Sequence, residues 1–85
     1  MKTNVTNFQG MPNQFVISTE EGHYFKSYGS IIVFRPINGK VQLDINKWDY
    51  SITTGKYRNL FLGETKKETE SKIKNGEYEL VDLNS

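Results

Sequence analysis

The residues best suited to recognise another molecule gather in one stretch of the chain, around its only tryptophan, Trp48. Flat aromatic rings beside Lys and Arg side chains form stacking sites for single-stranded nucleic acid. Tyr, Trp and Arg are also the usual anchors of protein–protein interfaces. The stretch is therefore predicted to be a binding site, with both kinds of partner left open. Its candidate residues are Lys47, Tyr50, Ser51, Lys56, Arg58 and Asn59.

The side chains of this stretch are expected to divide between a core and a surface. We expect Trp48 and Tyr57 to lie in the core, because large aromatic side chains supply much of the buried area of a small domain. The remaining polar and charged side chains are then free to form an exposed functional face, with Tyr50 beside them. That face is expected to contain Tyr50, Lys56, Arg58 and Asn59.

No residues of the chain form a recognisable catalytic or metal-binding set. The sequence has no Cys and a single His, His23, so a transition-metal site would lack ligands. The acidic residues do not follow the spacing of a calcium-binding loop, and neither a phosphate-binding glycine loop nor a nucleophile elbow occurs. Lys56 and Tyr57 are neighbours on a predicted helix and point in different directions. We therefore expect a protein that is not an enzyme and needs no metal or cofactor.

The charge balance argues against a general binder of polyanions. Eleven basic and ten acidic residues give a net charge of +1. A DNA-recognition helix needs several uncompensated cations, whereas Glu68 and Glu70 offset the lysines of the last helical pattern. A host or viral protein is therefore the preferred partner, and nucleic acid is the alternative.

Length and hydropathy predict a single small domain. The chain has 85 residues, which leaves a thin hydrophobic core. No apolar segment has the composition of a secretory signal or approaches the roughly 18 residues of a membrane span. We therefore expect a cytoplasmic protein without membrane contact, as a monomer or a small homo-oligomer.

Two short helical patterns follow the candidate site. Tyr57, Leu60 and Phe61 have the spacing of one helix face, after a predicted N-cap at Thr53 or Thr54. Gly63 has the place of a C-terminal cap. The four residues 65–68, Thr-Lys-Lys-Glu, match the capping box, which predicts a second helix over Lys66–Asn75.

Apolar alternation predicts a sheet ahead of these helices. Strands are expected over residues 14–19, 23–27, 30–35 and 40–46, with Asn38-Gly39 as a type I′ turn and a closing strand over 78–81. The apolar positions change from odd numbers, Val41 to Ile45, to even numbers from Trp48. A β-bulge near Asn46 would return both sets to one face.

The predicted fold is α+β, with a four-stranded antiparallel sheet, two short helices on one face and one C-terminal strand. Residues 14–85 are expected to form this domain. Residues 1–13 have no sustained apolar period, so a loose N-terminal arm is expected, with Phe8 docked on the core.

The sequence from Phe15 to Asn84 resembles a family of small uncharacterised proteins encoded by phages and plasmids of Gram-positive bacteria. The matching motifs are W-D-Y-S at 48–51, T-T-G-K-Y-R-N at 53–59, F-L-G-E-T at 61–65 and Y-x-L-x-D-L-N at 78–84. The resemblance implies an accessory protein of a mobile element that binds a host macromolecule. An anti-CRISPR-like inhibitor of a host defence nuclease is the specific expectation, and it rests on this context alone.

Overall fold

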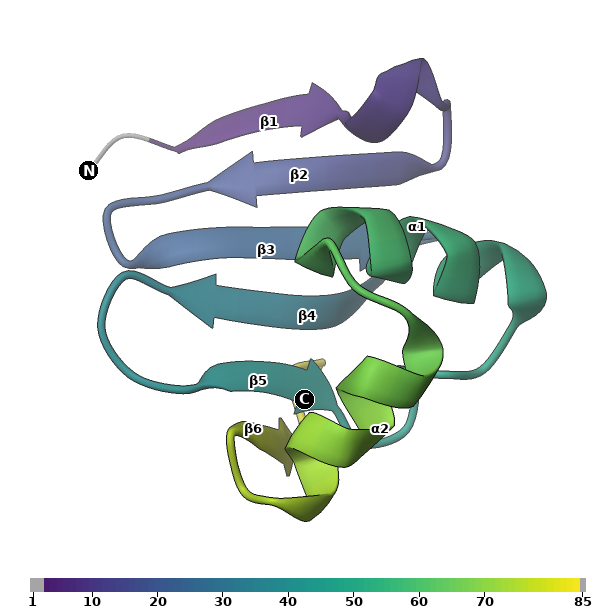
Figure 1. Ribbon diagram of the computed structural model, residues 1–85. Coiled ribbons are helices and arrows are strands. Elements are labelled where there is room, and N and C mark those ends of the chain that lie inside the picture. Colours follow the sequence, from purple (N-terminus) through teal and green to yellow (C-terminus); the bar gives the residue numbers. More distant parts are fainter. Residues whose placement is uncertain (1–2, 85) are drawn as a thin grey trace.

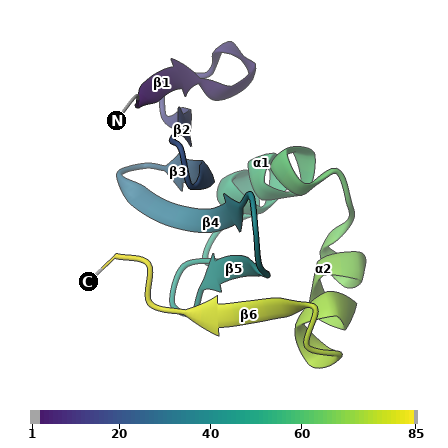
Figure 2. The same cartoon turned by 90° about the vertical axis from the view of Figure 1, so that its left-hand side faces the viewer.

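The computed structural model describes residues 3–84, in which one sheet carries both helices on the same face (Figures 1 and 2). The strands are β1 (Asn4–Asn7), β2 (Gln14–Ser18), β3 (Gly22–Ser27), β4 (Ser30–Pro36), β5 (Val41–Asp44) and β6 (Tyr78–Val81). The helices are α1 (Ile52–Leu62) and α2 (Lys66–Lys74), and a 3₁₀ turn, η1, spans Phe8–Gly10. The predicted α+β class and the placement of both helices on one face are confirmed.

The sheet differs from the prediction in size and in direction. It has six strands that follow one another in chain order. The first five pair antiparallel, whereas β6 runs parallel to β5. A parallel pair needs a crossover, and α1 and α2 together form it. The prediction of a four-stranded antiparallel sheet with one C-terminal strand was therefore wrong in detail, because β1 adds a strand and the parallel β6 makes the sheet mixed.

Residues 4–10 form a strand and a 3₁₀ turn where a loose arm was expected. Asn4 pairs with Ser18 and Asn7 with Phe15, so β1 is the outer strand of the sheet. Its side chains are all exposed, which is why no apolar period marked it. The predicted docking of Phe8 is confirmed, since its ring packs edge-on against three rings of the core. Residues 1 and 2 of the expected arm lie outside the described residues.

The bulge predicted near Asn46 does not form, because β5 ends at Asp44. Asp44 is 1% exposed although alternation predicted an outward side chain. Its carboxylate accepts hydrogen bonds from the backbone N–H groups of Asn46, at 3.1 Å, and Leu83, at 2.8 Å. Asp favours such local turns. The chain therefore leaves the sheet here, and Ile45, which was expected inside, is 53% exposed.

The type I′ geometry occurs in a different hairpin from the predicted one. Tyr28 and Gly29 have φ angles of 49° and 84° and connect the paired residues Ser27 and Ser30. Two positive φ angles in a two-residue loop are what a type I′ turn requires. In the loop 37–40 only Gly39 has a positive φ, at 106°. The tight turn therefore aligns β3 with β4, and the Asn-Gly pair belongs to a wider loop.

The core lies between the sheet and α1. Its buried residues are Phe25, Ile32, Val33, Leu43, Tyr57 and Phe61. The predicted core position of Tyr57 is confirmed, and Trp48 is partly buried against this cluster. The stacked rings of Phe25 and Phe61, 5.6 Å apart, join β3 to α1.

Local caps set both ends of α1 and the start of α2. Ser51, rather than Thr53 or Thr54, caps α1, and its hydroxyl accepts a hydrogen bond from the backbone N–H of Thr54. Gly63 takes the left-handed conformation after α1, at a φ of 70°, as predicted. The predicted capping box of Thr65 and Glu68 is also present. These caps place α2 directly after the turn that follows α1.

Candidate binding groove

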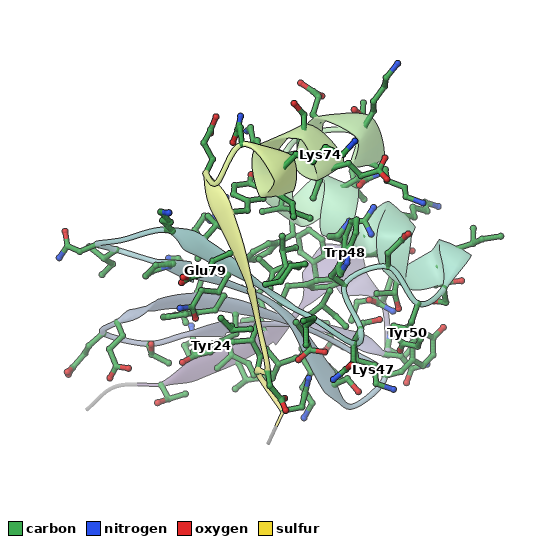
Figure 3. All side chains as sticks on the ribbon, turned by 90° about the horizontal axis from the view of Figure 1, so that it is seen from below. Tyr24, Lys47, Trp48, Tyr50, Lys74 and Glu79 are labelled. Carbon is green, nitrogen blue, oxygen red and sulfur yellow. The ribbon has the colours of Figure 1, made fainter. Side chains whose placement is uncertain are left out.

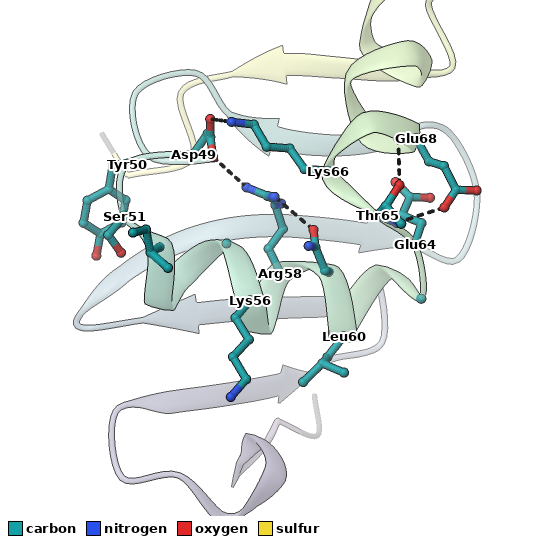
Figure 4. A pocket seen from close by; sticks show the side chains of 14 residues that line it. Asp49, Tyr50, Ser51, Lys56, Arg58, Leu60, Glu64, Thr65, Lys66 and Glu68 are labelled. Atoms are coloured by element: carbon teal, nitrogen blue, oxygen red, sulfur yellow. Dashed lines mark hydrogen bonds and ion pairs between the residues drawn. The ribbon is translucent and has the colours of Figure 1, made fainter.

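An open groove of about 1080 Å³ runs along the outer side of α1 to the start of α2 (Figure 4). Five of the six candidate residues predicted from the sequence line it. They are Tyr50, Ser51, Lys56, Arg58 and Asn59. Lys47 is not part of the lining, but its ammonium group lies 5.0 Å from the centre of the Tyr50 ring (Figure 3). The structure thus brings the predicted residues together around one groove.

The outer side of α1 exposes apolar side chains. Ile52 is 94% exposed and Leu60 is 50% exposed, with the exposed Lys56 between them. These three residues are spaced by four, so they lie along one side of the helix. Tyr50, which is 42% exposed, lies just before the helix. We call Tyr50, Ile52, Lys56 and Leu60 the outer strip of the groove.

Sequence reasoning missed part of this strip. The spacing placed Leu60 on the same helix face as Tyr57 and Phe61, but those two residues are buried and Leu60 is 50% exposed. Ile52 falls among the even-numbered apolar positions that follow Trp48 and was expected to share the sheet face after a bulge, whereas it is the first residue of α1. The available signal was the spread of the apolar residues around the 11-residue helix, since one face cannot bury all of them.

Arg58 does not belong to the exposed face on which it was predicted. Only 1% of it is exposed. Its guanidinium donates to the Trp48 backbone carbonyl at 2.6 Å and to Asn59 Oδ1 at 2.9 Å. Buried charge is tolerated when it is paired and hydrogen-bonded. Arg58 is therefore a structural residue that holds the loop before α1, and it occupies the amide oxygen of Asn59.

Asp49 links that loop to both helices. Its carboxylate lies 3.3 Å from the guanidinium of Arg58 and 2.8 Å from the ammonium of Lys66 (Figure 4). Burial opposes ionisation of this carboxyl group, but hydrogen bonds from Lys66 and Arg58 outweigh it and lower the pKa of Asp49. The same hydrogen bond to Asp49 raises the pKa of Lys66. Both cations are therefore committed to one carboxylate.

Glu64 fixes the junction of α1, α2 and β6. Its carboxylate accepts hydrogen bonds from Thr69 at 2.6 Å, Lys72 at 2.7 Å and Tyr78 at 2.8 Å. Burial again opposes ionisation, but these donors together lower the pKa of Glu64. Burial and the bond to Glu64 raise the pKa of Tyr78. The Glu64 carboxylate, paired with Lys72, thus stabilises the side of the groove that lies next to α2.

The described residues contain no cluster suited to metal binding. Among residues 3–84, no three side chains of His, Cys, Asp or Glu come together in a way that holds an ion. In the same part of the chain, no helix combines the length and the apolar composition of a membrane span. The groove itself combines an apolar strip with paired charges.

Residues 1–77 match a family of unknown function (DUF8033), and the chain belongs to this family. No curated protein and no solved structure matches the chain.

Proposed function

We propose that this member of a family of unknown function is a non-enzymatic binding module that docks on another protein through the groove beside α1. The observation that carries the proposal is the outer strip. Ile52 and Leu60 are exposed by 94% and 50%, and neither belongs to the core cluster. Apolar surface in water costs about 25 cal/mol per Å², so covering it would stabilise a complex. A tyrosine such as Tyr50 beside an apolar strip is typical of interface anchors.

A protein partner is supported better than nucleic acid by the charges of the groove. Arg58 and Lys66 are both paired with Asp49, and Glu64 and Glu68 also line the groove. Lys56 is the cation of the lining that faces solvent without an ion pair among the described residues. Binding to phosphates at useful affinity takes several uncompensated cations. An apolar surface of the partner would complement the outer strip directly.

The resemblance to phage and plasmid proteins directs the search for the partner. In that context the protein would act in the cytoplasm of a bacterial host. A host nucleic-acid-processing complex, bound in the manner of an anti-CRISPR inhibitor, is therefore the first partner to test. This choice of partner rests on the resemblance, whereas the binding surface rests on the exposure of the outer strip.

The experiment compares the same kind of substitution, an exposed apolar residue to Asp, inside and outside the groove. The double variant Ile52→Asp/Leu60→Asp alters the outer strip, and Ile37→Asp alters a residue outside the groove that is 69% exposed. A partner captured from a Gram-positive lysate is identified by mass spectrometry, purified and titrated by calorimetry. The double variant is expected to bind it more than about tenfold more weakly, and Ile37→Asp as tightly as wild type.

Two outcomes would contradict the proposal. One is equal affinity of the double variant and wild type for the purified partner. The other is the absence of any specific protein partner together with a mobility shift of nucleic acid that weakens steeply with salt, as phosphate contacts require. The second outcome would favour the nucleic-acid alternative.

A further inference from the structure

The outer edge of β1 is an open strand edge. β1 is the first strand in the order of the sheet, and beyond it no strand of the described residues follows (Figure 1). All four of its residues are exposed. The backbone groups on its outer side are therefore available to a further strand.

Nothing in the sequence of β1 blocks such pairing. Natural edge strands are protected by short length, charged side chains, Pro or bulges. β1 is short, at four residues, but Asn4–Asn7 contains no charged residue and no Pro. The opposite edge differs. β6 carries Glu79, and Tyr78 on the same strand is hydrogen-bonded to Glu64 in the turn between α1 and α2. Only the β1 edge combines exposure with an uncharged sequence.

The face on which Val5 lies follows from the register. Val5 pairs with Ile17, Ile17 with Tyr24, and Tyr24 with Phe34. Paired residues share one face of a sheet and neighbours along a strand alternate. Phe25 packs under α1, so this row lies on the face without helices. Val5 is 55% exposed and is the last residue of this apolar row, at the edge of the sheet.

We propose that two copies of this chain pair through β1, antiparallel and across a two-fold axis, with Val5 opposite the partner's Val5. When two identical edge strands pair antiparallel, the two-fold axis that relates the two copies is perpendicular to the sheet. Each residue of β1 therefore pairs with a residue of the partner's β1 that lies on the same face of the sheet. A pair centred on Val5 meets this condition. It places Val5, the one apolar residue of β1, next to the partner's Val5. Asn4 then lies opposite the partner's Thr6.

A second copy suits this edge for two further reasons. Two uncharged edges meet without repulsion, and a pair of β-branched residues is a favourable cross-strand contact. The row from Phe34 to Val5 continues across the axis into the same row of the partner, which covers the exposed side of Val5. Because the axis is perpendicular to the sheet, both helical layers and both grooves face the same side.

The absence of Cys from the sequence allows a direct test. In Val5→Cys the two new thiols would face each other across the axis. The Cα atoms of directly opposite antiparallel residues are about 4.5–5.5 Å apart, within the range of a disulfide. Val5→Cys is expected to form a covalent dimer under mild oxidation. Ile37→Cys, which places a thiol at an apolar site that is still more exposed than Val5, is expected to remain largely uncross-linked.

The oligomeric state provides the second measurement. Sedimentation of the wild type from micromolar to millimolar concentration is expected to show a reversible dimer, and Val5→Lys, which sets two like charges opposite each other, is expected to abolish it. Val5→Lys alters an exposed residue, so its far-UV circular dichroism should match the wild type. A wild type that is monomeric throughout, a dimer that Val5→Lys leaves intact, or equal cross-linking of the two Cys variants would overturn the proposal. The groove variant Ile52→Asp/Leu60→Asp should retain the dimer, so this inference and the proposed function fail independently.

Discussion

The guanidinium of Arg58 donates a 2.6 Å hydrogen bond to the backbone carbonyl of Trp48, and its central carbon lies 5.2 Å from the centre of the indole ring. One side chain of α1 thus holds both the backbone and the ring of the residue that precedes the groove. The adjacent Asp49 completes the contact by pairing with Arg58 and with Lys66 at the start of α2. The position of Tyr50 and of the outer strip depends on this buried cation, which itself contacts solvent hardly at all.

Arg58→Ala is expected to lower the free energy of unfolding by about 2–4 kcal/mol, because it leaves the Trp48 carbonyl unpaired and opens a cavity. Asp49 is one-third exposed, so water compensates part of the lost ion pair. Chemical denaturation followed by Trp48 fluorescence measures the change. Lys56→Ala, a truncation of an exposed cation on the same helix, should stay within about 0.5 kcal/mol of wild type. Equal stability of the two variants would show that Arg58 is not a structural residue.

Ser51→Ala is expected to destabilise the protein by about 1 kcal/mol, because the hydroxyl of Ser51 caps α1 through the backbone N–H of Thr54. Ser51→Asp should retain most of the stability, since Asp also caps helices and favours the positive end of the helix dipole. Ser71→Ala, at an exposed position within α2, is the matched control. Thermal denaturation distinguishes the three variants. If Ser51→Ala and Ser71→Ala melt alike, Ser51 does not have the capping role assigned to it.

Acid is expected to weaken the fold through Glu64 and Asp49. The folded state lowers the pKa of both carboxyl groups, so the unfolded chain binds protons first as the pH falls. Their contribution is complete above the unfolded pKa of about 4 and disappears as the pH falls through the lower folded values. The denaturation midpoint should therefore be lower near pH 3 than at neutral pH.

Glu64→Gln tests the source of this acid sensitivity. The variant keeps the shape of the side chain but removes the titrating group that accepts from Thr69, Lys72 and Tyr78. It is expected to be less stable than wild type at neutral pH and to lose less stability on acidification. If Glu64→Gln loses as much stability between neutral pH and pH 3 as wild type does, the acid sensitivity belongs to other carboxyl groups.

Of the two Asn-Gly sequences, Asn38-Gly39 is expected to deamidate faster than Asn75-Gly76 in the folded protein. Deamidation begins when the backbone nitrogen of the glycine attacks the Asn side-chain amide, and Asn is accordingly a thermolabile residue. The side chain of Asn75 is hydrogen-bonded to Glu77, and the Gly76 N–H donates to the Ile73 carbonyl. Asn38 is exposed and its side chain is hydrogen-bonded to none of the residues 3–84.

Peptide mapping by mass spectrometry after incubation at mildly alkaline pH measures both rates. The control is the same incubation in concentrated urea, in which the two sites should react at similar rates because the fold no longer protects Asn75. A faster reaction at Asn75 in the folded protein would contradict the restraint assigned to its hydrogen bonds.

The features predicted correctly depend on residues close together in the chain. The Thr65–Glu68 capping box and the turn at Gly63 follow from side-chain and backbone preferences within four residues. Apolar alternation likewise located β2, β3, β4 and β6 to within a few residues. The same kind of signal failed at Asp44, where alternation continued in the sequence while a local Asp turn ended the strand.

The sequence by itself determined the α+β class, the two capped helices and the stretch that contains the groove, because caps, turns and apolar periods act over a few residues. Only the tertiary structure decided that β1 joins the sheet, that β6 runs parallel to β5, that Arg58 is buried against Trp48, and that Leu60 faces outward. Each of these depends on a partner far away in the chain or on which side of α1 meets the sheet. Sequence spacing does not record such contacts. The residues next to Arg58 in the sequence would be the same whether its side chain were buried or exposed.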